Sequence, residues 1–499
     1  QQTQRCAVGC QLRCHAIMNI AKLIKSQGVE LVRFAWCDTH GMLRGKTLTA
    51  NAAIEALDKG VGMVSTLMLK DTSDRTAFKV FEPSIAQDLP GFEFANNLLL
   101  KPIPNSFKVL PWADKTGWIQ CQPFFQNGEA VLYDTRFQLQ SALNKLKSNG
   151  LQMVCGLEVE FHIYRLRDAQ HGTDLDPHLA TWPGACPEVS LIHPGYNLLA
   201  ENWFDMAEEP LRIVQHTAQA LGLPLLSLEI ELGPSQVEAV FDATDALTAA
   251  DNMVLFRSAV RQALRRAGYY ATFMCRPPFE NIMSSGWHLH QSLVDAIHGC
   301  NAFMRDTPQA NTLANDARHT LSEIGSHYLA GVLEHAQGMT AMCTPTVNGF
   351  GRFRPNALAP QSILWGRDNR GAMLRVIGQA GDPSTRIENR LGEPAANPYL
   401  YMASQIHAGL QGMQEKSMPP LATDSPYGNS DEALNNQAVR IPNNLSDALL
   451  ALQDNSAMRE GFGSEFLRYY ARIKKSEQQR FDDAEDKLEF QKREYFSRI

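Results

Sequence analysis

Several features are absent from this sequence of 499 residues, and each absence excludes a class of protein. No apolar run approaches the roughly 20 residues that a membrane-spanning helix needs. Basic residues are not in excess, because the formal net charge is −7, so the composition indicates neither a nucleic-acid nor an anionic-membrane partner. The opening stretch QQTQRCAVGCQLRC lacks the charged and apolar regions of a secretory signal. We therefore expect a cytoplasmic protein.

A disulfide framework is also missing, because the ten cysteines are scattered along the chain, as in proteins with reduced thiols. Cys6, Cys10 and Cys14 recur at every fourth position and would share one stripe of a helix. A metal or redox site is one interpretation of that stripe. We favour packing of small residues, because no nearby histidine or second cysteine pair completes a site.

The chain is long enough for a large core, and its pattern of elements predicts two domains of the α+β class. We expect an N-terminal extension at residues 1–16, a small domain at 17–115 and a larger domain at 122–499. The small domain is predicted to contain helices at 17–30 and about 51–59. Between them, LVRFAWCD is expected to be a strand and HGMLRGKT a turn.

In the larger domain, the segments WIQCQPFF, MVCGLEVEFHIY and LSLEIEL are predicted to be strands. They alternate with helices that we expect at 209–221 and 245–267. A helical region is predicted at 446–482, with Ser446 as its N-cap.

Two glutamates lie inside the strand-like stretch GLEVEF at residues 156–161. Because side chains alternate between the faces of a strand, Glu158 and Glu160 point the same way, a few ångströms apart. Neighbouring carboxylates repel each other, and burial increases that cost. The pair therefore predicts a positive charge opposite them.

Three further segments carry side chains of the kind that bind metal ions. The segments LEIELGPSQVE, SSGWHLHQSL and RIENRLGEP contain, in chain order, Glu229, Glu231, Glu238, His288, His290 and Glu388. Taken singly, each segment has an ordinary alternative, because surface strands often carry glutamate and an isolated His-x-His is more often structural. Together, many carboxylates with one imidazole suit a hard divalent cation, Mg²⁺ or Mn²⁺. Zinc fits less well because no cysteine accompanies the histidine.

An arginine-rich stretch follows at residues 348–376, and its arginines are Arg352, Arg354, Arg367, Arg370 and Arg375. A solvated basic loop is the ordinary interpretation. However, arginine binds carboxylate and phosphate groups with two parallel hydrogen bonds. Metal-binding carboxylates together with arginines are typical of phosphoryl transfer, where positioning and charge neutralisation supply most of the catalysis.

These segments together resemble the glutamine synthetases, and the type I branch most closely. The resemblance covers residues of about 20–480, where GLEVEF, ELGPSQVE, SGWHLHQSL, NGFGRFRP, RDNRGAMLR and STRIENRLGEPAANPYLYMA occur in family order. It implies a β-grasp N-terminal domain and a catalytic domain whose curved antiparallel sheet builds a funnel-shaped site between neighbouring subunits. It also implies a homo-oligomer, a dodecamer of two stacked hexameric rings.

The resemblance, carried over residue by residue, implies a centre that contains two metal sites. One cation would be bound by Glu160, Glu231 and Glu238, and the second by Glu158, His288 and Glu388. The two glutamates of GLEVEF would thus face different cations. We expect Mg²⁺ or Mn²⁺, about two or three ions in each centre.

The resemblance also implies where the substrates bind and what reaction follows. ATP would lie along His290, Ser292 and Arg375, and L-glutamate would be bound by Arg352 and Arg390. Arg370 and Arg352 would act in catalysis as charge on the transferring phosphate spreads. The γ-carboxylate of glutamate attacks the γ-phosphate of ATP, and an amine then attacks the resulting γ-glutamyl phosphate.

The sequence departs from ammonia-using members at two positions of the amine pocket. Leu358 replaces an acid in the loop after Arg352, and Ser65, or a neighbour such as Val64, replaces an aspartate. Losing both acids removes the attraction for ammonium and favours a larger, less polar amine. An aromatic amine such as aniline is the best candidate, because its weakly basic nitrogen needs no carboxylate to remove its proton. Short alkyl amines come next, followed by polyamines.

Other features of the pocket are less well defined by the sequence. Met63 and Trp365 are further apolar candidates for its lining. Met283 and Ser284 replace the family's usual Asn-Gly before the histidine motif, in the segment that helps to hold the α-amino end of glutamate. Glutamate is still the expected acid, because both of its arginines remain.

Several alternatives stay open. The loop could have drifted so that another acid substitutes, which would make the protein an ammonia-using glutamine synthetase. A non-catalytic scaffold is a further possibility, although the complete set of six metal ligands favours an enzyme. Regulation by nucleotidylation would need a tyrosine such as Tyr427, whose surroundings do not match the modified segment.

Overall fold

The computed structural model describes residues 15–167, 182–354, 357–426 and 439–499. Cys6, Cys10, Cys14 and Tyr427, which were considered above, lie outside the described residues. Within the described ranges, no helix has the length and apolarity needed to cross a membrane.

The N-terminal part of the chain forms a mixed sheet with the strand order β2-β1-β6-β4-β3, in which β5 also pairs with β6. Strand β1 runs antiparallel to β2 and parallel to β6. A helix at 15–26 precedes the sheet. The elements that follow are β1 (Leu31–Cys37), β2 (Leu43–Thr49), α2 (Ala50–Lys59), β3 (Val61–Val64), η1 (Ser65–Leu69), α3 (Ile85–Asp88), η2 (Glu93–Ala95), β4 (Asn97–Pro102), η3 (Pro104–Ser106), β5 (Lys108–Val109) and β6 (Thr116–Phe124).

Two sequence-based expectations about this region were wrong. Strand β2 contains most of the stretch that we expected to be a turn, and the turn itself is confined to Asp38–Met42, where the amide of Asp38 donates to the carbonyl of Met42. The segment WIQCQPFF, assigned to the larger domain, forms most of β6, which lies between β1 and β4 of the N-terminal sheet. Both faces of β6 are buried, so its apolar pattern alone could not indicate which sheet it joins.

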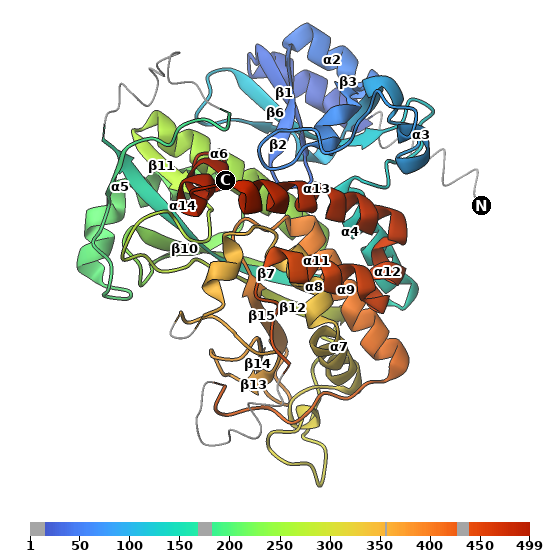
Figure 1. Cartoon of the computed structure of the whole chain (residues 1–499), viewed down its shortest axis with the longest axis vertical. Coiled ribbons are helices and arrows are strands. Elements are labelled where there is room, and N and C mark those ends of the chain that lie inside the picture. Colours follow the sequence, from blue (N-terminus) through green and yellow to red (C-terminus); the bar gives the residue numbers. More distant parts are fainter. Residues whose placement is uncertain (1–14, 168–181, 355–356, 427–438) are drawn as a thin grey trace.

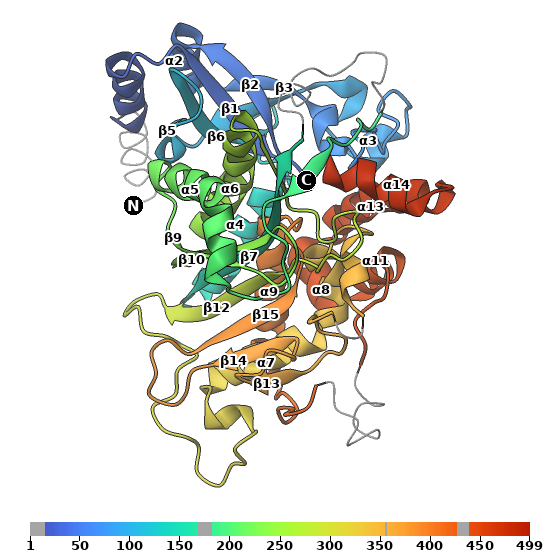
Figure 2. The same ribbon diagram turned by 90° about the vertical axis from the view of Figure 1, so that its left-hand side faces the viewer.

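A larger, mainly antiparallel sheet follows, with the order β13-β14-β15-β12-β7-β10-β9, and β8 and β11 also pair with β7. Figure 1 shows it below the N-terminal sheet, and Figure 2 shows β12, β15 and β14 side by side. Its strands are β7 (Leu151–Leu166), β8 (Val189–Leu191), β9 (Leu225–Ile230), β10 (Gln236–Asp245), β11 (Tyr269–Thr272), β12 (Trp287–Asp295), β13 (Trp365–Arg367), β14 (Leu374–Ile377) and β15 (Arg386–Gly392).

Helices cover one face of this sheet and leave the other for polar side chains. On the covered face, Phe161 of β7 stacks on Phe273 and meets the edge of Phe256 in helix α6 (Ala246–Arg266). Helix α9 is attached to the same face, where Gln291 and Asn389 donate to Gln405 Oε1 at 3.1 and 2.7 Å. Because side chains alternate along a strand, the glutamates of β7 must lie on the opposite face.

The remaining helices complete the second part of the chain, and α13 runs between the two sheets (Figure 1). There the hydroxyl groups of Tyr469 and Thr39 are hydrogen-bonded at 2.7 Å. The helices are α4 (Thr135–Ser148), α5 (Glu201–Ala220), α6 (Ala246–Arg266), η5 (Ala317–His319), α7 (Glu323–Glu334), α8 (Ala336–Cys343), η6 (Gly349–Arg352), α9 (Pro398–Glu415), α11 (Leu445–Asp454), α12 (Ser456–Phe462), α13 (Ser464–Asp483), α14 (Lys487–Gln491) and the π-helical η7 (Lys492–Phe496).

Two predicted helix starts need correction. The helix expected at 209–221 begins earlier, at Glu201, and accommodates Pro210 in its interior. The C-terminal helical region is capped by Asn444, whose side chain accepts from the amide of Asp447, so Ser446 is not the N-cap. Asparagine is as good an N-cap as serine, so residue preference could not separate the two positions.

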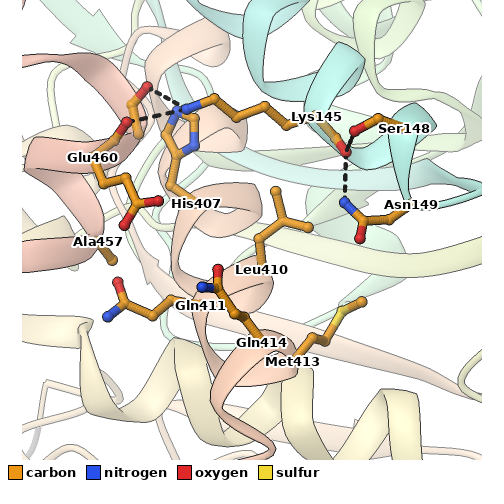
Figure 3. A pocket seen from close by; sticks show the side chains of 11 residues that line it. Lys145, Ser148, Asn149, His407, Leu410, Gln411, Met413, Gln414, Ala457 and Glu460 are labelled. Atoms are coloured by element: carbon orange, nitrogen blue, oxygen red, sulfur yellow. Dashed lines mark hydrogen bonds between the residues drawn. The ribbon is translucent and has the colours of Figure 1, made fainter.

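Helices α4, α9 and α12 enclose a cavity of about 460 Å³ (Figure 3). Lys145 reaches across it and donates to the carbonyls of Glu460 and Gly461, both at 3.1 Å. His407 is buried beside these groups, and its Nε2 has no hydrogen-bond partner. Burial, together with the charge of Lys145, lowers the pKa of His407 to about 3. The imidazole is therefore neutral in the folded protein near pH 7.

We expect His407 to make the fold acid-sensitive. Its pKa is lower in the folded chain than in the unfolded chain, so the unfolded chain binds the proton first, and stability falls as the pH drops from about 6.5 towards 3. Between pH 6.5 and 5, the wild type should lose roughly 1.5 kcal/mol more unfolding free energy than a His407→Phe variant, which cannot be protonated. Urea denaturation at several pH values measures this, and parallel pH profiles of the two proteins would refute it.

Candidate active site

The register of the larger sheet brings the predicted metal ligands together on its open face. Glu158 of β7 lies opposite His288 of β12, and Glu160 lies opposite Glu238 of β10. On the next strand, Glu388 of β15 lies opposite His290. Residues directly opposite each other in antiparallel strands point to the same face, so three strand pairs build one polar surface.

Around Glu158 the histidines stand within reach of the carboxylates. His288 Nδ1 lies 3.3 Å from Glu158 Oε2 and 3.7 Å from Glu388 Oε1. His290 Nε2 lies 3.0 Å from Glu158 Oε1, at an angle that forms no hydrogen bond. Burial alone would raise the pKa of Glu158, but the contacts with His288 and His290 outweigh it and hold this pKa far below its usual range. Burial, followed by the charge of Arg390, lowers the pKa of His288 to about 4.

Glu160, Glu231 and Glu238 form a second group, in which neighbouring carboxylates repel one another. Glu160 Oε2 accepts from the amide of Gly286 at 2.8 Å and from Gln236 Nε2 at 3.1 Å. Glu238 Oε1 is buried without a hydrogen-bond partner. Burial raises the pKa of all three carboxyls, and repulsion from neighbouring carboxylates adds to the rise. A cation placed among them would remove both costs.

Two of the expected arginines, Arg375 and Arg390, lie on β14 and β15, and Arg352 at the end of η6 reaches the end of β15. Glu388 is completely buried between two of them, with Arg375 Nη1 at 3.0 Å from Oε2 and Arg390 Nη1 at 2.5 Å from Oε1. Arg390 Nε is buried and unpartnered, so it retains a donor for an anion. Arg352 is also buried, but it donates to the carbonyls of Arg390 and Gly392 at 3.0 and 3.1 Å. Arg370 is exposed, in the segment between β13 and β14.

A cavity of about 200 Å³ opens beside this surface, and the expected nucleotide residues His290 and Ser292 line it together with Glu158. Arg386 lines the same cavity and donates from Nε to His290 Nδ1 at 3.1 Å. Arg386 was not among the site residues expected from the sequence. Its spacing of two residues from Glu388 in a strand was the signal that could have placed it on the same face.

The donor set fits the hard divalent cations that the resemblance implies. Ligand atoms of Glu158, His290 and Glu388 lie within 4.8 Å of one another, and so do those of Glu158, Glu238 and His288. His290 was expected at the nucleotide, and here it also lies beside two predicted metal ligands, Glu158 and Glu388. Oxygen-rich groups with an occasional imidazole suit Mg²⁺ and Mn²⁺.

The residues predicted to line the amine pocket lie in two separate parts of the chain. Ser65 and Val64 lie at the end of β3 in the N-terminal sheet, where Ser65 Oγ is buried without a partner and Val64 is 38% exposed. Leu358 follows η6 in the other part of the chain, is 62% exposed, and has a φ of 54°. Figures 1 and 2 both place β3 near the top of the molecule and β13, the strand after Leu358, near the bottom.

Gly286 is expected to be required for the geometry of this centre. A Cβ atom at this position would lie 2.5 Å from Arg352 Nη2, which is closer than atoms can pack, and 3.3 Å from His288 Nε2, which is a tight contact. Gly286→Ala should therefore displace Arg352 and raise the KM for an acid substrate by roughly tenfold, a cost of about 1.4 kcal/mol. The matched control is Gly184→Ala, because its Cβ would meet no atom within 4 Å. Steady-state kinetics that are equal for both variants would contradict this role.

Comparisons with known proteins agree with this geometry. The family model described as "Glutamine synthetase, catalytic domain" matches residues 132–493. A "Gamma-glutamylanilide synthase" of Acinetobacter sp is 37% identical over 470 residues, which cover 93% of this chain and 90% of that protein. A "Glutamine synthetase" of Methanosarcina mazei is 28% identical over 472 residues, covering 93% and 94%. The solved structure "GmaS/ADP complex-Conformation 1" has a TM-score of 0.74 and 26% identity, covering 94% and 97% of the two chains.

Proposed function

Because this chain belongs to the glutamine synthetase family, we propose that it joins the γ-carboxylate of L-glutamate to an amine other than ammonia. The chain is an ATP-dependent ligase of that family. An aromatic amine such as aniline is the substrate we favour. The observation that carries the proposal is Leu358, an exposed apolar residue where ammonia-using members carry an acid. The 37% identity to a protein named gamma-glutamylanilide synthase supports the same choice.

In the first chemical step, the chain orients the acid and the nucleotide. Arg390, with its unpartnered Nε, and Arg352 would hold the carboxylates of glutamate. An oxygen of the γ-carboxylate attacks the γ-phosphorus of ATP, the bond to the β-phosphate oxygen breaks, and ADP leaves. Arg370 and Arg375 would stabilise the negative charge that spreads over the transferring phosphoryl group, while Arg386, His290 and Ser292 border the cavity for the nucleotide.

In the second step, the amine nitrogen attacks the carbonyl carbon of γ-glutamyl phosphate, phosphate leaves, and the nitrogen loses a proton. A weakly basic amine, whose conjugate acid has a low pKa, arrives unprotonated, so it needs no carboxylate to take that first proton. An apolar Leu358 and a neutral Ser65 are therefore sufficient for such an amine, whereas ammonium would lack an acid to attract it.

Enzymes of this family use ATP and divalent metals, and we propose Mg²⁺ or Mn²⁺, about two or three in each centre. The proposed protein ligands are Glu158, Glu160, Glu231, Glu238, His288 and Glu388. Bound cations would neutralise charge on the ATP phosphates and on these carboxylates. The raised pKa values in the group around Glu160 and the unpartnered Glu238 Oε1 support this assignment.

We also propose that the amine pocket is completed between copies of the chain. Ser65 and Leu358 belong to parts of one molecule that lie far apart in Figures 1 and 2, so a neighbouring copy would supply one of them. Two stacked hexameric rings are the assembly that we propose. A cytoplasmic location is proposed as well, and the free thiols of all cysteines in the described ranges support it.

Ammonia-using glutamine synthetase is the second candidate, because several relatives at 28–30% identity carry that name. Alkylamine or polyamine ligation is the alternative with respect to the amine. The scaffold alternative would leave the six buried or half-buried metal ligands without a purpose.

The experiment is glutamate-dependent release of phosphate from Mg-ATP, measured with ammonium, ethylamine, isopropylamine, putrescine and aniline. We expect strong stimulation by aniline and little by ammonium. A higher kcat/KM for ammonium than for every other amine would assign the protein as a glutamine synthetase. Release that no amine stimulates, in a protein that still binds ATP, would refute ligation to these amines.

A further inference from the structure

Arg352 ends the short helix η6, which follows a turn that is hydrogen-bonded to residues outside the substrate site. The guanidinium lies against the end of β15 through its bonds to backbone carbonyls, as described above. The backbone reaches Arg352 through the turn Thr346–Gly349, which η6 continues. Anything that moves this turn also moves Arg352, since only two residues separate the turn's last glycine from the arginine.

The turn is fastened by a buried carboxylate that the proposed chemistry does not use. Glu393 follows β15 directly and is completely buried. Its Oε1 accepts from the amide of Thr346 at 2.8 Å, and its Oε2 accepts from Thr346 Oγ1 at 2.9 Å. Thr346 Oγ1 in turn accepts from the amide of Gly349 at 3.0 Å. Both carboxylate oxygens of Glu393 thus hold the turn that leads to Arg352. Glu393 itself directly follows β15, the strand that carries Arg390.

The fit between the turn and this carboxylate is close. A Cβ atom on Gly349 would lie 2.6 Å from the carboxyl carbon of Glu393 and 2.5 Å from Thr344 Cγ2. Burial raises the pKa of Glu393 to about 7, and the hydrogen bonds from Thr346 oppose that rise. Burying a carboxyl group costs folding free energy, and the hydrogen bonds from Thr346 offset part of that cost.

The opposite side of the turn is attached to the C-terminal helices. Asn348 Nδ2 donates to Gln491 Oε1 at 2.8 Å and to the carbonyl of Arg276 at 3.1 Å. The amide of Val347 donates to Tyr495 Oη at 3.4 Å. The Tyr495 hydroxyl donates to Glu477 of α13, which also pairs with Lys474. The turn therefore lies between β15 and the C-terminal segment, held by side chains from both.

We propose that Glu393 and Thr346 form a latch that positions Arg352 for the acid substrate, and that Gln491 and Tyr495 support it from the C-terminal side. This inference rests on the proposed function, because it takes Arg352 as a ligand of glutamate. Glu393 and Thr346 are positioning residues, which act on the affinity for the acid through Arg352.

The test compares Thr346→Val with Thr346→Ser. Valine has nearly the shape of threonine but loses the hydroxyl that bridges Glu393 and Gly349, whereas serine keeps it. We expect Thr346→Val to raise the KM for glutamate by roughly tenfold and to leave the KM for ATP within about twofold. Thr346→Ser should restore a KM for glutamate near that of the wild type. Unchanged glutamate kinetics in the valine variant, or equal losses for glutamate and ATP, would overturn the proposal.

A second variant and a second measurement distinguish loss of the latch from misfolding of a variant and from failure of the proposed function. Gln491→Leu removes one of the two acceptors of Asn348 Nδ2, at a half-buried position, and should raise the KM for glutamate by roughly threefold. Hydrogen exchange of residues 344–354 reports the turn without any catalysis. Exchange there should be faster in Thr346→Val than in Thr346→Ser. If the wild type releases no phosphate, the proposed function fails, and equal exchange in both variants would separately refute the latch.

Discussion

Replacing Glu160 by glutamine is expected to lower glutamate-dependent phosphate release by at least roughly a hundredfold. The amide has the shape of the carboxyl and can still accept from Gly286 and Gln236, but it offers no charge to a cation. A loss of about 3 kcal/mol of charge stabilisation corresponds to a rate loss of roughly a hundredfold. Glu160→Ala should show at least the same loss. Phosphate release at saturating Mg-ATP measures both.

The stability of the same variant distinguishes a lost metal ligand from a damaged fold. Burial and repulsion by Glu231 raise the pKa of Glu160 to about 8, so the metal-free chain must take up a proton there when it folds near pH 7, which lowers its stability. Glu160→Gln should therefore have a Tm without metal that is equal to or higher than that of the wild type. Added Mg²⁺ should raise the Tm less in the variant. Glu208→Gln, an exposed position on α5, is the control. Full activity of Glu160→Gln would contradict the proposed two-metal assignment.

Introducing an acid at the amine pocket should reverse the preference for the amine. Leu358→Glu restores the carboxylate that ammonia-using members carry, which attracts a small cation and disfavours an aromatic ring. Because an exposed charge pair contributes up to about 1 kcal/mol, we expect the ratio of kcat/KM for aniline to that for ammonium to fall by roughly fivefold. Competing turnover of both amines gives this ratio directly.

The backbone conformation at residue 358 allows the leucine, glutamate and glutamine side chains to be compared directly. Leu358 has a φ of 54°, which is strained for any residue except glycine, so leucine, glutamate and glutamine carry a similar cost. Leu358→Gln is thus the matched control, since it adds a polar group of the same shape without the charge. If the glutamine and glutamate variants behave alike, polarity rather than charge determines the preference. An unchanged ratio in both would mean that residue 358 does not border the amine.

The local sequence pattern was enough to predict that the two glutamates share one face of a strand, but not to predict which strands pair. Glu158 and Glu160 share a face because side chains alternate along a strand, and the long β7 keeps that alternation. That His288 would lie directly opposite Glu158 depends on the pairing of segments 130 residues apart. Such pairing leaves no local signal, so the motifs of the resemblance were needed to predict it.

The errors have physical causes as well. Gly41 and Gly45 suggested a turn, but Gly45 lies in β2, where a side chain would collide with the backbone of Phe34. Strand β6 was assigned to the wrong sheet because a strand buried on both faces carries no mark of its neighbours. Arg352 was expected to point at the substrate, and no sequence pattern could indicate that its guanidinium also binds carbonyls at the end of β15.

The most direct measurement is a competition in one vessel. The protein is incubated with L-glutamate, Mg-ATP and equal concentrations of aniline and ¹⁵N-labelled ammonium, and the products are quantified by mass spectrometry. The proposed function predicts γ-glutamylanilide in excess over labelled glutamine, with one phosphate released for each amide formed. Labelled glutamine as the main product would contradict it, because the neutral amine pocket at Leu358 and Ser65 would then bind ammonium after all.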